Sequence, residues 1–296
     1  MGAFFSKQEP SPPPSPEFDK PWRTMPWGKN DLEKKLRDFR LNQPNIQFVR
    51  ILLVGDTGAG TSSFINSVNN AFQKRITSGA LVNTAVRGKS FTKTYETHYI
   101  EGEDGSLLPF AFNDVMGFQA NEAGALSVDL IRALRGVLPE GYNFQKASSC
   151  CVQDSCYRSN PSLEEQTFCV VNIIAADKVS MMNDSVINKM KNIREAAAEL
   201  KLPQVIIMTR PDLACPLVKG DVRKVYTSKK IKEKMEMCSH LLGIPMSHIF
   251  PVKNYHEEMD TDDDIDALIF KALDQIVNIA CDALKKKSSN SGDKPK

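Results

Sequence analysis

Residues 47–62 have the sequence QFVRILLVGDTGAGTS, an apolar run that ends in a glycine-rich loop. The run predicts a buried strand, and residues 61–74 space their apolar side chains as one face of a helix does. The loop between them fits the pattern GxxxxGK[ST] at every fixed position except one, because Thr61 stands where the pattern has lysine. Such a loop directs successive backbone N–H groups at a phosphate, and the positive end of the following helix adds to the attraction. The predicted phosphate-binding residues are Gly55, Asp56, Thr57, Gly58, Ala59, Gly60, Thr61 and Ser62, and the Ser62 hydroxyl is also a predicted ligand of Mg²⁺.

The absence of the lysine is expected to weaken phosphate binding by an amount that can be estimated. A hydrogen bond to a charged group contributes about 1.5–3 kcal/mol. Its loss predicts phosphate binding that is about ten- to a hundredfold weaker, or somewhat more, if no other cation replaces it. Hydrolysis is expected to suffer further, because the same charge stabilises the transition state. Arg87, Lys89 and Lys93, in the next loop, are the candidates for such a replacement.

The rest of the middle of the chain alternates strand and helix signals. Residues 95–100 and 107–113 predict a pair of strands joined by a turn. Further apolar runs at 168–175, 204–208 and 248–252 predict strands, separated by predicted helices at 127–138, 185–200 and 229–242. This alternation is typical of a doubly wound α/β fold, a mostly parallel sheet with helices on both faces. We expect one such P-loop G domain from about residue 46 to residue 284.

In a sheet of this kind, ligands bind beyond the carboxyl ends of the strands. Asp114-Val115-Met116-Gly117 follows a predicted strand and fits DxxG, in which Asp114 would position Mg²⁺ and Gly117 would meet the γ-phosphate. The Thr- and Lys-rich loop before residue 97 is the expected first switch, with Thr92 and Thr94 as its candidate contacts. Phe118 stands where Ras-like enzymes have the glutamine that orients water. No catalytic residue is therefore assigned, and efficient GTP hydrolysis is not expected.

The base is predicted to be guanine. Thr209-Arg210-Pro211-Asp212 follows the predicted fifth strand and is a variant of [NT]KxD. The Asp212 carboxylate can accept hydrogen bonds from the ring N–H and amino groups of guanine, which adenine lacks, and the Arg210 stem can cover the base as a lysine stem does. Lys253 and Asn254 follow the next strand, where a last base-contacting loop belongs. The expected cofactors are GTP or GDP with Mg²⁺, and the alternative for Thr209–Asp212 is a plain strand-end turn.

The ends differ from this domain. Residues 1–17 are Pro-rich and predict a disordered arm, and residues 18–45 carry Trp22, Trp27 and a short helix at 31–39 that we expect to pack on the body. Residues 261–284 predict an amphipathic helix, followed by a basic flexible tail at 285–296. Met1-Gly2-Ala3-Phe4-Phe5-Ser6 fits the N-myristoylation pattern, with Gly2 as the acceptor, and one acyl chain would give weak membrane association.

Composition bounds the class of protein. The chain has 296 residues, and 38 Lys and Arg nearly balance 36 Asp and Glu, so a nucleic acid is not an expected partner. No apolar run is long enough to cross a bilayer, and the start lacks the features of a secretory signal. Seven cysteines, an odd number, predict reduced thiols in a cytoplasmic protein. Cys150, Cys151 and Cys156 lack a nearby histidine or second cysteine pair, so we expect free loop thiols there and no metal site.

With these motifs in place, the chain resembles the interferon-induced protein 44 family of P-loop GTP-binding-like proteins. The resemblance is carried by KPWRTMPWG at 20–28, RILLVGDTGAGTSSFINSVNNAF at 50–72, FNDVMGF at 112–118, LPEGYNF at 138–144 and IPMSHIFPVKNY at 244–255. It implies a Ras-like G domain, a cytoplasmic location, and protein partners in the interferon-driven antiviral response. Thr61 and Arg210 depart from the usual lysines.

Three functions stay open at this stage. The first is a guanine-nucleotide switch of the innate immune response with weak or no hydrolysis. The second is a nucleotide-free pseudo-GTPase that serves as an interaction scaffold. The third is a myristoylated, membrane-tethered adaptor. Thr61 separates the first two, and Gly2 separates the third.

Overall fold

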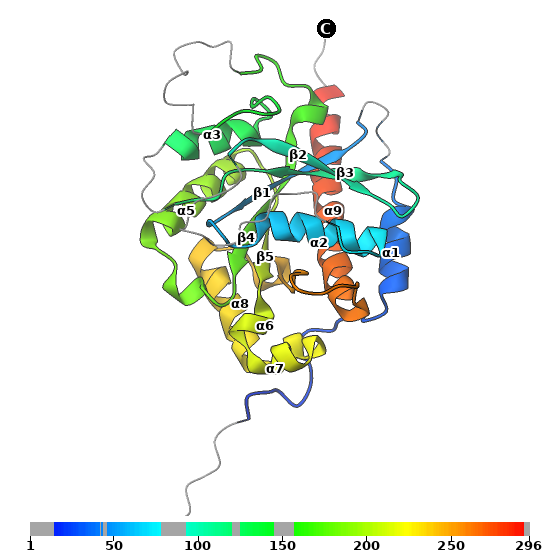
Figure 1. Ribbon diagram of the computed structural model, residues 1–296. Helices are drawn as coiled ribbons and strands as arrows, with labels where there is room; N and C mark the ends of the chain where they lie inside the picture. The colour runs from blue at the N-terminus through cyan, green and yellow to red at the C-terminus, as the bar shows by residue number, and fades with distance from the viewer. Residues whose placement is uncertain are drawn as a thin grey trace, which may run out of the picture.

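The computed structural model describes residues 15–41, 43, 46–77, 93–119, 125–144 and 157–292. Within these ranges the chain forms a six-stranded sheet in the order β2-β3-β1-β4-β5-β6 (Figure 1). The strands are β1 (Val49–Gly55), β2 (Glu96–Glu101), β3 (Leu107–Asp114), β4 (Thr167–Ala175), β5 (Gln204–Thr209) and β6 (Ile249–Val252). Only the β2–β3 pair is antiparallel among them, and the other pairs are parallel. The predicted doubly wound α/β fold of a P-loop G domain is confirmed.

Helices cover both faces of the sheet. One face packs on α3 (Ala125–Leu134), α5 (Asp184–Glu199) and α8 (Lys229–Leu242), and the other packs on α1 (Lys29–Arg37), α2 (Thr61–Gln73) and α9 (Asp263–Gly292). Side chains of β1 alternate between the two cores, since Leu52 and Val54 face the first group while Ile51 and Leu53 face the second. The shorter elements are η2 (Leu163–Glu165), η3 (Val179–Met181), α6 (Pro211–Ala214), α7 (Pro216–Gly220), η4 (Val222–Tyr226) and η5 (Met246–His248).

The segment ahead of the sheet packs on the body. The backbone N–H of Trp22 donates to the Tyr226 carbonyl at 3.1 Å. The two aromatic rings meet edge to face, with 5.4 Å between their centroids. Trp27 packs against the same core and lies beside the guanidinium of Arg223. Farther along, α1 lies against α9, with Leu32 and Leu36 buried between them and the sheet (Figure 1).

The predicted flexible tail from residue 285 is wrong in its first part, because α9 continues to Gly292. Polar lysines indicated an end to the helix, but Lys287 is half-buried against the start of β4. Its ammonium lies 3.4 Å from both the Gln166 Oε1 and the Thr167 carbonyl, and over the Phe168 ring. These tertiary contacts hold the last turns in helical form.

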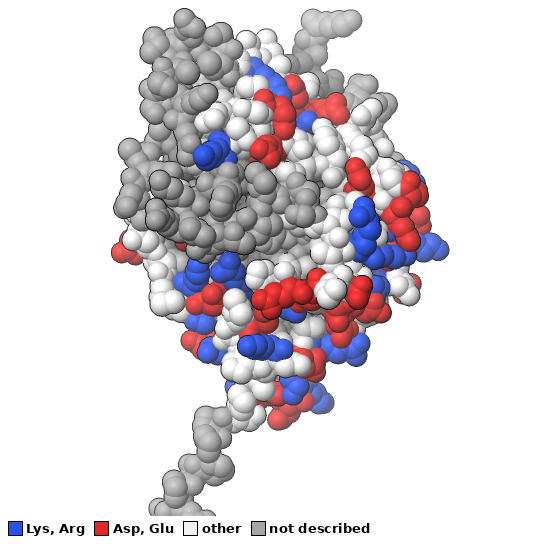
Figure 2. All heavy atoms as spheres, in the orientation of Figure 1, with Lys and Arg blue, Asp and Glu red and all other residues white. Residues whose placement is uncertain are grey.

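Acidic and basic side chains of the described residues are interspersed on the face drawn in Figure 2. In the described part of the chain, none of the helices is both long and apolar enough to span a bilayer. Gly2, the Pro-rich arm before residue 15, and Cys150, Cys151 and Cys156 lie outside the described residues.

Candidate nucleotide site

The phosphate loop joins β1 to α2 in a backbone conformation that requires glycine. Gly58 and Gly60 have φ angles of +76° and +100°, in the left-handed region. A Cβ on Gly60 would also lie 3.1 Å from the Asn254 amide nitrogen. At the start of the loop, a Cβ on Gly55 would lie 2.7 Å from the Ile173 carbonyl oxygen of β4. The loop therefore packs closely on its neighbours at both ends.

Three successive carbonyl groups of this loop, those of residues 58–60, are bound by side chains at or just after the carboxyl ends of β5 and β6. The Arg210 guanidinium donates to the first and the Thr209 hydroxyl to the second, each at 2.6 Å. The Asn254 amide donates to the third at 3.1 Å. We call these three side chains the carbonyl clamp. Thr209, Arg210 and Asn254, which were predicted to contact the base, thus orient the phosphate loop.

The carbonyl clamp leaves a row of backbone donors on the other side of the loop. The Thr57 N–H donates to the Phe118 carbonyl at 3.0 Å, and the Ala59 N–H donates to the Asp56 carbonyl at 2.9 Å. The remaining N–H groups donate to no other group among the described residues, and they belong to Gly58, Gly60, Thr61, Ser62 and Ser63. Free N–H groups at the first turn of a 13-residue helix form a site for an anion such as phosphate.

The predicted magnesium ligands are brought together. The Ser62 hydroxyl donates to Asp114 Oδ2 at 2.9 Å, and Asp114 is only 2% exposed. Hydroxyl and carboxylate oxygens are ligands that suit Mg²⁺. Gly117 lies so close to the loop that a Cβ there would come within 2.9 Å of the Thr57 Cα. DxxG and the phosphate loop therefore form one surface.

Phe118 cannot orient water, because its side chain is 1% exposed and lies in the core. Its main chain instead extends the contact with the loop, since the Phe118 N–H donates to the Gly55 carbonyl at 2.9 Å. Its carbonyl also accepts from the Thr57 hydroxyl at 2.9 Å. The next residue, Gln119, is held by the Lys189 ammonium, which donates to its carbonyl at 2.6 Å.

The base side of the site has unused polar atoms. Asp212 lies in the first turn of α6, and no described residue forms a hydrogen bond or ion pair with its carboxylate. The Asn254 Oδ1 is buried and has no hydrogen-bond partner. Lys253 is bound to Glu258 at 2.6 Å. These unused acceptors fit a base that brings N–H donors.

Sequence reasoning missed one cation beside the loop. Lys178, just after β4, lines the same small cavity as Asp56 and Thr57. Burial raises the pKa of Asp56, and the Thr57 N–H and the charge of Lys178 oppose this. The signal was present, because Lys178 follows the carboxyl end of a strand that neighbours β1.

The predicted switch contacts have a mixed outcome. Thr94 donates its hydroxyl to Glu96 and pairs through its backbone with Asn143, so its contact with a γ-phosphate stays a prediction. Thr92, Arg87 and Lys89 lie outside the described residues. Lys93 is exposed, and its carbonyl accepts from Phe144 N–H at 3.0 Å.

Comparison with known proteins identifies relatives of this chain. No protein-family model matches the chain. Interferon-induced protein 44 of Homo sapiens is 32% identical over 258 residues, which are 87% of this chain and 58% of that protein. Over these residues the chain is similar to the interferon-induced protein 44 family. Interferon-induced protein 44-like of Homo sapiens is 29% identical and interferon-induced protein 44 of Mus musculus is 31% identical, over 87% and 86% of this chain and 57% and 60% of theirs. The chain spans less than two thirds of the length of these relatives.

Solved structures of GTP-binding proteins match the chain at low similarity. Era of Aquifex aeolicus bound to GDP.AlF4- is 12% identical, with a TM-score of 0.42 over 80% of this chain and 57% of that chain. A probable GTP-binding protein engB is 11% identical, with a TM-score of 0.40 over 80% of this chain and all of that chain. The fold of this interferon-induced protein 44 relative follows from its own strand order and from the loop after β1.

Proposed function

We propose that the chain binds GTP or GDP with Mg²⁺ and hydrolyses GTP weakly or not at all. It would act in the cytoplasm, with protein partners of the interferon-induced antiviral response. The observation that carries the proposal is the carbonyl clamp with the free N–H row opposite it. A loop whose carbonyl groups at residues 58–60 are engaged by side chains leaves backbone N–H groups free to bind a phosphate.

The other parts of the site support the same ligand. Ser62 and Asp114, 2.9 Å apart, would hold Mg²⁺, which would supply positive charge to neutralise the phosphates. Asp212, which has no partner among the described residues, would accept hydrogen bonds from guanine. Neither Thr61 nor the buried Phe118 can supply what fast hydrolysis needs, namely a charge at the phosphates and a group that orients water.

Calorimetric titration with GTP, GDP and ATP in Mg²⁺ tests the proposal. We expect the wild type to bind guanine nucleotides but not ATP, and Thr61→Lys to bind them about ten- to a hundredfold more tightly. Asp212→Asn should weaken guanine binding by a similar factor while leaving the unfolding transition unchanged. Failure of both the wild type and Thr61→Lys to bind would refute the assignment of the site.

A pseudo-GTPase scaffold is the second candidate, and Thr61 favours it. On this account the wild type would bind no nucleotide, and Thr61→Lys alone would restore binding. Myristoylation of Gly2, with weak membrane association, is a separate proposal that rests on the sequence pattern. Intact-mass measurement of protein from eukaryotic cells tests it, and a Gly2 without acyl mass would refute it.

A further inference from the structure

Two lysines of α1 form ion pairs with aspartates of α9. Near the start of α1, the Lys29 ammonium lies 2.6 Å from Asp263 Oδ1 and 2.9 Å from Asp266 Oδ2. Near its end, the Lys35 ammonium lies 2.6 Å from Asp274 Oδ1. Both lysines fasten the same two helices, but only the contacts of Lys29 lead toward the nucleotide site.

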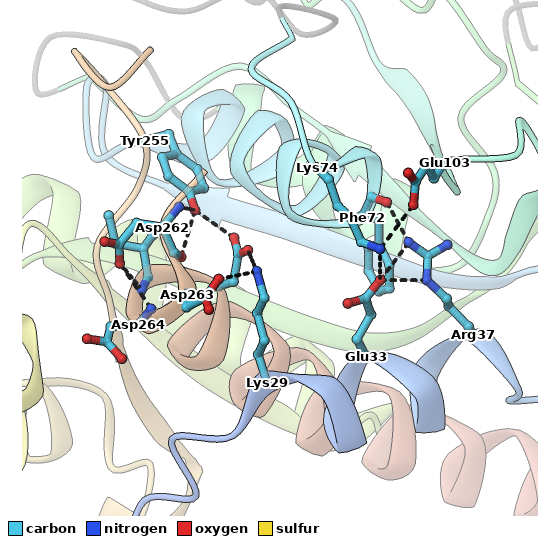
Figure 3. A network of polar contacts seen from close by, with 12 residues as sticks. Lys29, Glu33, Arg37, Phe72, Lys74, Glu103, Tyr255, Asp262, Asp263 and Asp264 are labelled. Carbon is cyan, nitrogen blue, oxygen red and sulfur yellow. Dashed lines mark hydrogen bonds and ion pairs between the residues drawn. The ribbon is translucent and has the colours of Figure 1, made fainter. Parts of the chain in front are cut away.

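The buried carboxylate of Asp266 links Lys29 to the loop after β6. The Asp266 side chain is 0% exposed, and its second oxygen accepts a hydrogen bond from the Tyr255 hydroxyl at 2.6 Å. The same hydroxyl accepts from the Asp262 N–H at 2.8 Å. Figure 3 shows Lys29 and Tyr255 approaching the start of α9 from opposite sides.

Tyr255 is adjacent to the carbonyl clamp. Its N–H donates to the Ser67 hydroxyl of α2 at 2.9 Å, which ties the loop to the helix that follows the phosphate loop. The preceding residue, Asn254, bonds to the Gly60 carbonyl. A continuous chain of contacts therefore runs from α1 to the phosphate loop.

We propose that Lys29, Asp266 and Tyr255 form a positioning relay through which α1, ahead of the G domain, holds Asn254 in place for nucleotide binding. None of the three would touch the nucleotide, so each acts through the loop. The proposal rests on the proposed function for its readout in affinity, and on the fold alone for its readout in loop mobility.

The relay depends on charge. A buried carboxylate is costly unless it is paired and hydrogen-bonded. Without Lys29, Asp266 would keep only the Tyr255 hydroxyl and the helix around it. It would then take up a proton or open toward water, and either change weakens its hold on Tyr255. The loop that carries Asn254 would gain freedom, and the Gly60 carbonyl would lose its side-chain partner while keeping the Phe64 N–H of α2.

Lys29→Met and Tyr255→Phe test the relay, with Lys35→Met as the matched control. The control removes an ion pair between the same two helices that does not lead to Tyr255. We expect the two relay variants to bind GDP about two- to thirtyfold more weakly than wild type, and the control to bind as wild type does. We expect faster amide hydrogen exchange at residues 253–255 in the relay variants, measured against the β4 amides of the same protein.

Each outcome decides one proposal. Exchange at residues 253–255 that is the same in Lys29→Met and Lys35→Met would overturn the relay. Tyr255→Phe keeps the ion pairs of Lys29 and Lys35 with α9, so this variant remains informative if Lys29→Met fails to fold. If the wild type binds no nucleotide, the proposed function fails, and the exchange comparison alone supports or overturns the relay.

Discussion

Neutralising Glu258 tests how the last loop of the site is held. One oxygen of this carboxylate accepts from the backbone N–H groups of His256 at 2.7 Å and Glu257 at 3.2 Å. The other accepts from the Lys253 ammonium at 2.6 Å. Partial burial raises the pKa of Glu258. The His256 N–H and the Lys253 ammonium lower it by more than burial raises it, and the resulting pKa is about 2. The carboxylate is therefore more stable in the folded chain than in the unfolded one.

The shift in the pKa of Glu258 between the folded and unfolded chain sets how much this carboxylate contributes to the free energy of unfolding, and at which pH. A folded pKa of about 2 against an ordinary value of 4.5 corresponds to about 3 kcal/mol at full strength. The side chain is 25% exposed, so solvent screening reduces the expected contribution to about 1–2 kcal/mol. This stability is present above pH 4.5, and it is lost as the pH falls through the folded pKa near 2.

Urea unfolding of wild type and Glu258→Gln between pH 7 and pH 2 measures this contribution. At pH 7 the variant should lose about 1–2 kcal/mol of unfolding free energy, and the difference should shrink below pH 4.5. Glu257→Gln, one residue away and exposed, makes the same change in charge and should leave stability within about 0.5 kcal/mol. A Glu258→Gln variant as stable as wild type at pH 7, or a difference that persists unchanged to pH 2, would refute the reasoning.

Two further substitutions probe the loop and the packing of α1. Gly60→Ala should cost about 1–2 kcal/mol for its left-handed backbone, and more because Asn254 must move, whereas Gly58→Ala has open space and should cost only the backbone strain. Equal unfolding free energies for the two variants would contradict this. Leu36→Ala, at a position 2% exposed, should cost about 2–5 kcal/mol in urea unfolding, and a loss below 1 kcal/mol would contradict its place in the core.

Local signals sufficed for the sheet and for part of the site. β4 has nine consecutive buried residues, and its apolar run was evident from composition. Ser62 and Asp114 were predicted to share a magnesium ion from two separate motifs, and the fold places them 2.9 Å apart. The strand and each of the two motifs could be identified from a few neighbouring residues, whereas the closeness of Ser62 and Asp114 also depends on the pairing of β1 with β3.

The carbonyl clamp could not be predicted in the same way. Arg210 and Asn254 were identified as base contacts from their positions after strands, but their bonds to the phosphate loop depend on the register of β5 and β6 relative to β1. Register is set by packing across the whole sheet. The prediction of where α9 ends was wrong for a related reason, because the contact of Lys287 with β4 spans 120 residues of sequence.

The segment that wraps the body before β1 also determines where the folded unit starts. A fragment beginning at Ile46 would keep every nucleotide motif, but it would lose the bonds of Phe18 and Trp22 to the Thr227 and Tyr226 carbonyls. It would also expose to water the apolar side of α9 that α1 covers. A fragment made to study this domain should therefore begin ahead of Ser15, because a fragment limited to the nucleotide motifs would lack the segment that packs on the body.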